Sequence, residues 1–258
     1  MKKALPLLAL LVLPLVGCDS KTPTGSTAVA GTNGTTSPAS PTAAKLPDEL
    51  KNDAYDYYGL ANDKPVRLEI VKTGSTPEIG TRTFSLEKVE DGKATFLQSQ
   101  GGPLATEGDI TLSLEKDGLY VMSSTRSKLK AHSLEIPAKL EPGGGWKDHT
   151  EMNQDGQQIV LDNDLKIIRK ERVTTKGGTF DDALYVTSTG KGSINGQAVT
   201  LTTQHWYVRG MGPVKQIVEV TTKGKPLQTI TIQLAAPENA ETSAPAPTSA
   251  PAGTETKK

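Results

Sequence analysis

The sequence is poor in cysteine, aromatic residues and histidine, and each shortage narrows what the protein can be. Cys18 is the only cysteine among 258 residues, so no disulfide can form within the chain. Aromatic residues make up 4% of the chain, which predicts a thin hydrophobic core. The histidines number 3 and form no closely spaced pair, so no zinc motif is present. We therefore expect neither a metal nor another cofactor.

The chain also lacks an excess of charge of either sign. It has 29 lysines and arginines against 29 aspartates and glutamates, giving a formal net charge of +0. Nucleic-acid binding needs a basic surface to neutralise phosphates, and electrostatic docking on anionic lipids needs a basic cluster. We therefore expect no nucleic-acid partner.

No apolar run is long enough to cross a bilayer, which takes about 20 residues. Two lysines precede the N-terminal apolar run, residues 4–16, and Pro6 and Pro14 interrupt it. A basic start followed by a short apolar segment is typical of a secretory signal. We therefore interpret residues 1–17 as a signal peptide.

The signal ends in Leu15-Val16-Gly17-Cys18, which resembles the lipobox of bacterial lipoproteins. That resemblance implies cleavage before Cys18, a diacylglycerol thioether on its sulfur, and acylation of the new amino group by a chain such as palmitate. One acyl chain binds a membrane weakly, whereas two or more hold stably. An ordinary signal with an unrelated cysteine is the alternative. The lipidated protein would lie on the extracytoplasmic side of the cell membrane or the outer membrane.

Low-complexity segments flank a central domain. Residues 18–45 are dominated by Ser, Thr, Ala, Gly and Pro, and residues 236–258 alternate Ala with Pro. Neither segment can bury much apolar surface, so we expect a disordered tether and a disordered tail. Residues 46–235 are long enough for one β-rich domain.

Apolar and polar residues alternate through most of this domain, as in half-buried antiparallel strands. Residues 66–71, 110–115 and 230–234 show the pattern most clearly. A proline followed by acidic residues at 47–49 indicates one short N-terminal helix. The sequence thus predicts an all-β fold of roughly ten strands, arranged as a meander in a curved sheet, a half-open barrel or a sandwich.

Dipeptides that accept positive φ separate the strands. Asp91-Gly92, Asp117-Gly118 and Asn195-Gly196 predict two-residue hairpin turns. Asp155-Gly156 and Gly177-Gly178 mark further reversals.

Three segments together resemble a group of uncharacterised bacterial lipoproteins with a curved antiparallel sheet. They are Tyr57-Tyr58, the Pro-Gly-Gly-Gly-Trp stretch at 142–146, and Trp-Tyr-Val-Arg-Gly-Met-Gly-Pro-Val-Lys at 206–215. Pro213 departs from the apolar residue that the group has at that place. The resemblance implies a fold distantly like lipoprotein-carrier half-barrels, and it supplies no catalytic residues.

The segment at 206–215 also supports a binding hypothesis. Strand alternation places Trp206 and Val208 on one face, and His205, Tyr207 and Arg209 on the other. One interpretation is that Trp146, Trp206, Tyr207 and Arg209 form a binding face at the mouth of the sheet. The other is that Trp206 is core and the glycines only make a turn.

No string that matches a catalytic motif has the context which the chemistry requires. Ser85, Ser113 and Ser127 each begin an S-x-x-K string, but the first two lie in predicted strands, where the lysine is not one helical turn from the serine. No G-x-S-x-G, phosphate-binding or dinucleotide motif occurs, and Asp162-Asn163-Asp164 lacks the rest of a calcium loop.

We therefore expect a non-enzymatic, lipid-anchored binding or carrier module for an apolar ligand or an envelope partner. A structural or assembly scaffold of the cell envelope, acting through protein contacts, is the alternative.

Overall fold

A computed structural model describes residues 45–238, and the lipobox and both predicted tails lie outside that range except at its ends. The chain between them is dominated by strands. The strands are β1 (Val66–Lys72), β2 (Glu78–Glu90), β3 (Lys93–Gly101), β4 (Ile110–Glu115), β5 (Gly118–Ser124), β6 (Ser127–Leu129), β7 (Ser133–Pro137), β8 (Gly145–Gln154), β9 (Gln157–Thr175), β10 (Gly178–Ile194), β11 (Gln197–Val208), β12 (Gly212–Thr222) and β13 (Lys225–Leu234).

The helices are short. They are the 3-10 turns η1 (Asp48–Leu50) and η2 (Gly102–Glu107) and the α-helix α1 (Asp53–Tyr58). The side chain of Asn52 caps α1 by accepting a hydrogen bond from Tyr55 N, and Gly59 ends it with φ 77°. The predicted short N-terminal helix is thus confirmed, divided between η1 and α1.

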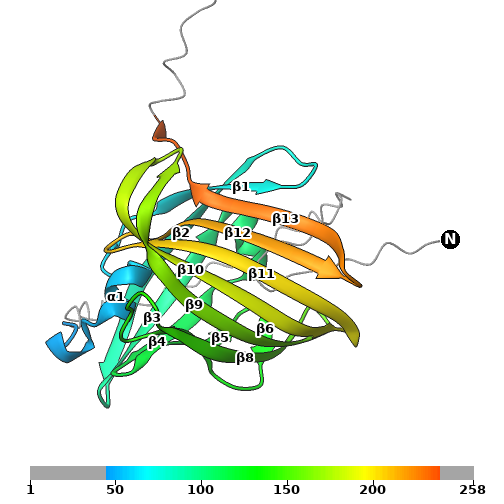
Figure 1. The fold of residues 1–258 in the computed structure, drawn as a ribbon. Coiled ribbons are helices and arrows are strands. Elements are labelled where there is room, and N and C mark those ends of the chain that lie inside the picture. The colour runs from blue at the N-terminus through cyan, green and yellow to red at the C-terminus, as the bar shows by residue number, and fades with distance from the viewer. Residues whose placement is uncertain (1–44, 239–258) are drawn as a thin grey trace, which may run out of the picture.

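All strands belong to one antiparallel sheet, in the order β6-β8-β9-β10-β11-β12-β13-β1-β2-β3-β4-β5-β7. Neighbours in the chain pair in most of the sheet, and β13 joins β1 to link the two halves. In Figure 1 the sheet curls, with β8 to β13 in the near wall and β2 to β5 behind them. The predicted all-β meander in a curved sheet is confirmed, with 13 strands in place of about ten.

Hairpin turns follow the dipeptide signals, with one correction. Asp91-Gly92, Asp155-Gly156 and Asn195-Gly196 have positive φ at both residues, the type I′ geometry that suits twisted strands. The prediction at Asp117-Gly118 was displaced by one residue, because Glu115 pairs with Gly118 and the turn lies between them. Gly118 is needed for packing instead, since a Cβ there would lie 2.7 Å from Ile136 O in β7.

The two edges of the sheet meet without forming a ladder. Its end strands, β6 and β7, are successive in the chain, and the curl brings β7 alongside β8. Ser133 Oγ on β7 donates to Asp148 Oδ1 on β8 at 2.7 Å. The sheet is therefore an open barrel with a side-chain seam between β7 and β8.

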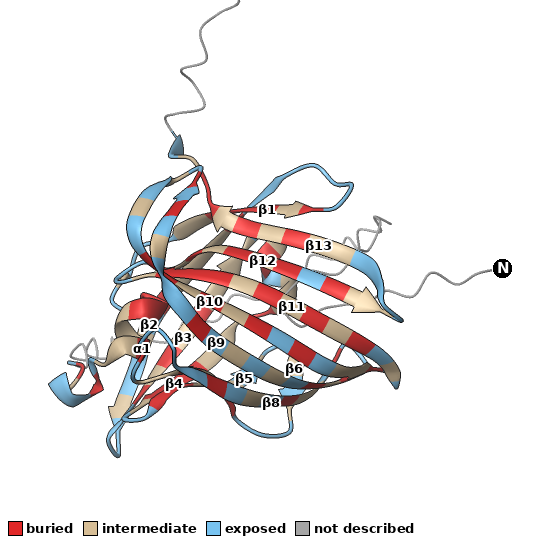
Figure 2. Cartoon of the chain, viewed as in Figure 1, coloured by how far each residue is buried: buried red, intermediate tan, exposed pale blue. Residues whose placement is uncertain are grey.

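Apolar side chains form two clusters, and Figure 2 shows buried residues recurring at alternate positions along β10 to β13. One cluster centres on β11 to β13 and β1, including Val218 and Ile230. The other surrounds α1 and includes Tyr57, Phe96 and Ile136. Because α1 contacts β5, β7, β11 and β12, it lies across one end of the curled sheet. Within residues 45–238, no helix is long and apolar enough to cross a membrane.

Candidate functional site

A cavity of ≈ 200 Å³ lies inside the curl of the sheet. Side chains from α1, η2 and most of the strands reach its wall, so distant parts of the chain meet there. Apolar residues line part of it, including Leu129, Met152 and Leu201. The charged and other hydrogen-bonding side chains in the wall are Tyr58, Arg82, Gln98, Glu107, Ser124, Ser127, Ser133, Glu135, Asp148, Thr150, Gln154, Asn163, Ser188, Thr203, His205, Tyr207 and Gln216.

A β-bulge delivers Glu135 to this wall. Leu119 pairs with Ile136 and Tyr120 pairs with Leu134, so Glu135 is the extra, unpaired residue of β7. Bulges re-aim side chains and are common beside functional sites. Burial, and next the negative charge of Asp148, raise the pKa of Glu135 from 4.5 to about 7. Glu135 is half-buried and lines the cavity, so protein atoms surround most of its side chain.

Asp148, on β8, is the better satisfied carboxylate. It accepts hydrogen bonds from Ser133 and Thr150, each at 2.7 Å, and a longer one of 3.4 Å from Asn163. Gly190 makes room for this group, because a Cβ there would lie 2.3 Å from Asn163 Oδ1.

Arg82 brings a positive charge to the cavity from β2. Within residues 45–238 its side chain forms neither an ion pair nor a hydrogen bond, and its Nε is buried without a partner. Two further buried atoms of the wall, Glu107 Oε1 and Gln216 Nε2, also lack partners. Burial raises the pKa of Glu107, although Gln100 donates to its other oxygen at 3.3 Å. Orphaned polar atoms of this kind call for water or a ligand.

The inner face of β11 supplies a neutral polar stripe. His205 Nε2 lies 2.8 Å from Thr203 Oγ1, which lies 2.7 Å from Ser188 Oγ. The rings of His205 and Tyr207 stack with centroids 5.6 Å apart. Burial, with the nearby positive charge of Arg82, lowers the pKa of His205 to about 4, so the imidazole is neutral at pH 7. Burial raises the pKa of Tyr207, so its phenol also stays neutral.

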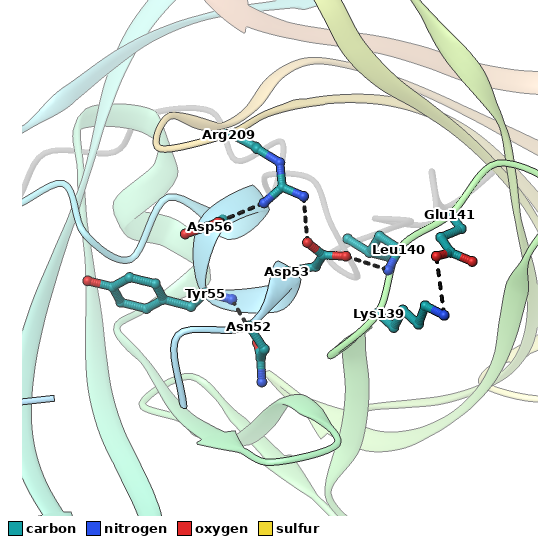
Figure 3. A network of polar contacts seen from close by, with 8 residues as sticks. All are labelled: Asn52, Asp53, Tyr55, Asp56, Lys139, Leu140, Glu141 and Arg209. Atoms are coloured by element: carbon teal, nitrogen blue, oxygen red, sulfur yellow. Dashed lines mark hydrogen bonds and ion pairs between the residues drawn. The ribbon is translucent and has the colours of Figure 1, made fainter. Parts of the chain in front are cut away.

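Helix α1 closes the end of the cavity and is held by charged and main-chain contacts. Arg209 donates to Asp53 at 2.6 Å and to Asp56 at 2.7 Å, and its guanidinium lies 4.4 Å from the centroid of the Tyr57 ring. Asp53 also accepts the backbone N–H of Leu140 at 2.9 Å, as Figure 3 shows. From the inner side of the helix, Tyr58 OH donates to Gln98 Oε1 at 3.2 Å.

Of the four residues proposed from the sequence as a binding face, Trp146 and Tyr207 share the apolar cluster around α1, Arg209 contacts α1, and Trp206 lies apart from them. Tyr207 lines the cavity, whereas Arg209 binds α1 at the surface. Trp206 points to the other face, where it stacks on Tyr185 and donates to Glu171 at 2.7 Å. Trp146 is packed in the cluster around α1, and its Nε1 is buried without a partner. The predicted lipidation site, Cys18, lies outside the described residues.

The sequence alone indicates no cluster of titratable groups, whereas the fold brings four charged side chains to one cavity. Arg82, Glu107, Glu135 and Asp148 come from separate elements and share no sequence motif. One sequence pattern did point to the cavity. On β11 the inward-facing positions are apolar at Val199 and Leu201 and then become polar at Thr203, His205 and Tyr207. Within residues 45–238, no group of three or more His, Cys, Asp or Glu side chains is arranged to hold a metal ion.

Comparison with known proteins gives fold likeness only. No protein-family model matches this sequence, and no curated protein matches it. A protein of Bacteroides fragilis described as exported, with a YmcC-like fold, is 10% identical, and the alignment covers 68% of this chain and 95% of that one at a TM-score of 0.47. A protein of Parabacteroides distasonis described as a lipoprotein is 12% identical, and the alignment covers 70% of this chain and 97% of that one at a TM-score of 0.46.

The lipoprotein YmcC from Escherichia coli is 10% identical, with 72% of this chain and 90% of that one covered at a TM-score of 0.32. These descriptions name exported proteins and lipoproteins. At such identities and TM-scores they define no function for this chain.

Proposed function

We propose that this protein is a lipid-anchored, extracytoplasmic binding protein that encloses a small polar ligand within its curled sheet. The anchor is the one inferred at Cys18. The observation that supports binding is the cavity of ≈ 200 Å³, whose wall carries the buried, unpartnered atoms Arg82 Nε, Glu107 Oε1 and Gln216 Nε2. Leaving such atoms unsatisfied costs about 1–3 kcal/mol each, so a ligand that pairs with them is favoured.

The charged side chains in the cavity wall restrict the class of ligand that can bind. An acyl chain would have to lie against Arg82 and Glu135, and burying an unpaired charge against hydrocarbon is costly. The apolar ligand expected from the sequence stays a prediction, and the charged wall favours a polar one. The volume is below the roughly 300–1,000 Å³ typical of sites for drug-sized molecules, so the ligand is small.

A matched pair of variants tests ligand enclosure. Ser188 faces the cavity on β10, and Thr189 is exposed on the opposite face of the same strand. We expect native mass spectrometry of the chain purified from its own membrane to show a small non-covalent adduct. Ser188→Phe should lose the adduct and Thr189→Phe should keep it, with both variants folded by circular dichroism. An adduct retained equally by both variants, or none in the wild type, would count against enclosure.

The anchor is tested separately. Mass spectrometry of the mature protein should find an acylated N-terminal Cys18, and Cys18→Ala should leave unprocessed precursor or release the domain from the membrane. A mature protein that begins at Met1 without lipid would refute the anchor and leave the cavity proposal intact.

A further inference from the structure

The cavity holds charges of both signs that do not neutralise one another by contact. Arg82 projects from β2, whereas Glu135 is on β7, and β3, β4 and β5 lie between these strands in the sheet. Glu107, at the end of η2, and Asp148, on β8, add two more carboxylates. Within residues 45–238, none of these four side chains forms an ion pair.

These charges nevertheless act on one another across the cavity. The positive charge of Arg82 opposes the rise in the pKa values of both Glu107 and Glu135, and it lowers that of His205. Arg82, Glu107 and Glu135 thus line one cavity, and within residues 45–238 no ion pair joins them. A ligand that carries both charges fits such a cavity, because each of its ends finds an opposite charge on a different wall.

We propose that the cavity binds a small zwitterion, with its anionic group on Arg82 and its ammonium group on Glu135. This deepens the proposed function and depends on it. A guanidinium presents several N–H donors in a plane, which suits a carboxylate, and the unpartnered Arg82 Nε is one of them. Asp148, which accepts hydrogen bonds from Ser133 and Thr150, lies close enough to act on Glu135 and adds a second carboxylate for the ammonium end.

The groups around Glu135 make this binding pH-dependent. Burial, and next Asp148 from β8, favour its protonated form, whereas Arg82 from β2 opposes protonation. Tyr58 from α1 and Tyr207 from β11 face it as neutral phenols, and His205 lies in the same wall as a neutral imidazole. An ammonium group that enters beside Glu135 favours the ionised carboxylate, so binding releases the proton.

Four probes with equal carbon chains test the proposal on the detergent-solubilised full chain by calorimetric titration. They are 4-aminobutyrate, which has both charges, butylamine, butyrate and the uncharged butanamide. We expect 4-aminobutyrate to bind at least about tenfold more tightly than the other three, since each charged contact contributes to affinity. Its affinity should fall by up to about tenfold per pH unit below pH 7, because protonated Glu135 no longer attracts the ammonium.

Two variants assign the ends of the ligand. Glu135→Gln should weaken 4-aminobutyrate and butylamine about tenfold, remove the pH dependence below pH 7, and leave butyrate unchanged. Arg82→Gln should weaken 4-aminobutyrate and butyrate and leave butylamine unchanged. If butanamide binds as well as 4-aminobutyrate, or if the variants weaken all probes equally, the zwitterion proposal fails while the binding function stands. If none of the four probes binds and native mass spectrometry finds no adduct, both proposals fail.

Discussion

Glu135 and His205 line the same cavity, and burial moves their pKa values in opposite directions. That of Glu135 rises from 4.5 to about 7, and that of His205 falls from 6.5 to about 4. Both shifts keep the neutral form at conditions where the free side chain would be charged. Because the two titrations overlap in pH and differ in sign, their effects on stability can be separated only by substituting one residue at a time.

Glu135→Gln is expected to stabilise the protein above pH 7. The folded state keeps the proton of Glu135 between pH 4.5 and pH 7 while the unfolded state loses it, so this residue lowers the free energy of unfolding as pH rises through that window. The loss is about 3 kcal/mol at about 1.4 kcal/mol per pH unit. Urea unfolding at a series of pH values should show the variant gaining on the wild type up to pH 7. A constant difference between the two curves would contradict the raised pKa.

His205→Gln is expected to change how the free energy of unfolding depends on pH below pH 6.5. Between pH 6.5 and pH 4 the unfolded state gains a proton on His205 and the folded state does not, so stability falls on acidification by about 3 kcal/mol. In the wild type this loss nearly cancels the gain from Glu135 between pH 4.5 and pH 6.5. We therefore expect a flat wild-type profile there, with opposite slopes in the two variants, both measured by urea unfolding. A steep wild-type profile with parallel variant curves would show that other groups dominate.

The sequence predicts those features of the fold that are set by neighbours in the chain. Asn195-Gly196 makes the expected hairpin because positive φ at both positions is a local preference. Pro213 lies beside the β11–β12 register shift, as expected for a residue without an N–H.

The cavity could not be predicted in the same way, because polar residues that face inward look like residues that face water. In β7 the alternation of Leu134 and Ile136 would place Glu135 on the wet face. The bulge opposite Leu119 and Tyr120 reverses that assignment, and it depends on pairing with β5. The binding-face hypothesis likewise treated Tyr207 and Arg209 as neighbours on one face, whereas Arg209 follows the end of β11 and binds α1.

Asp53→Ala is expected to destabilise the closed end of the sheet. It removes the acceptor of Arg209 Nη2 at 2.6 Å and of Leu140 N at 2.9 Å, so a partly buried N–H is left without its partner. We expect a loss of about 1–3 kcal/mol in the free energy of unfolding. Asp48→Ala is the control, because the Asp48 side chain is 87% exposed and its pair with Lys51 lies on the surface, where such pairs contribute little. Equal effects of the two substitutions on urea unfolding would mean that Asp53 does not anchor α1.

Gly118 and Gly190 both lie in strands, but an added Cβ would meet a backbone atom at Gly118 and a side-chain atom at Gly190. At Gly118 an added Cβ would lie 2.7 Å from Ile136 O, and at Gly190 it would lie 2.3 Å from Asn163 Oδ1. Main-chain atoms of β7 can yield only if the strands separate, whereas the end of the Asn163 side chain can rotate away. We therefore expect Gly118→Ala to cost about 1–3 kcal/mol and Gly190→Ala less than about 1 kcal/mol.

The same pair of variants tests how Glu135 is positioned. Because Gly118 permits the close approach of β7, Gly118→Ala should also disturb the bulge and move the pKa of Glu135 back toward 4.5. Gly190→Ala should leave that pKa near 7 while it displaces Asn163. The pKa is measured by carbon-13 NMR of the glutamate carboxyl groups, assigned with Glu135→Gln. An unchanged Glu135 titration in a folded Gly118→Ala protein would show that the approach of β5 and β7 does not place this carboxylate.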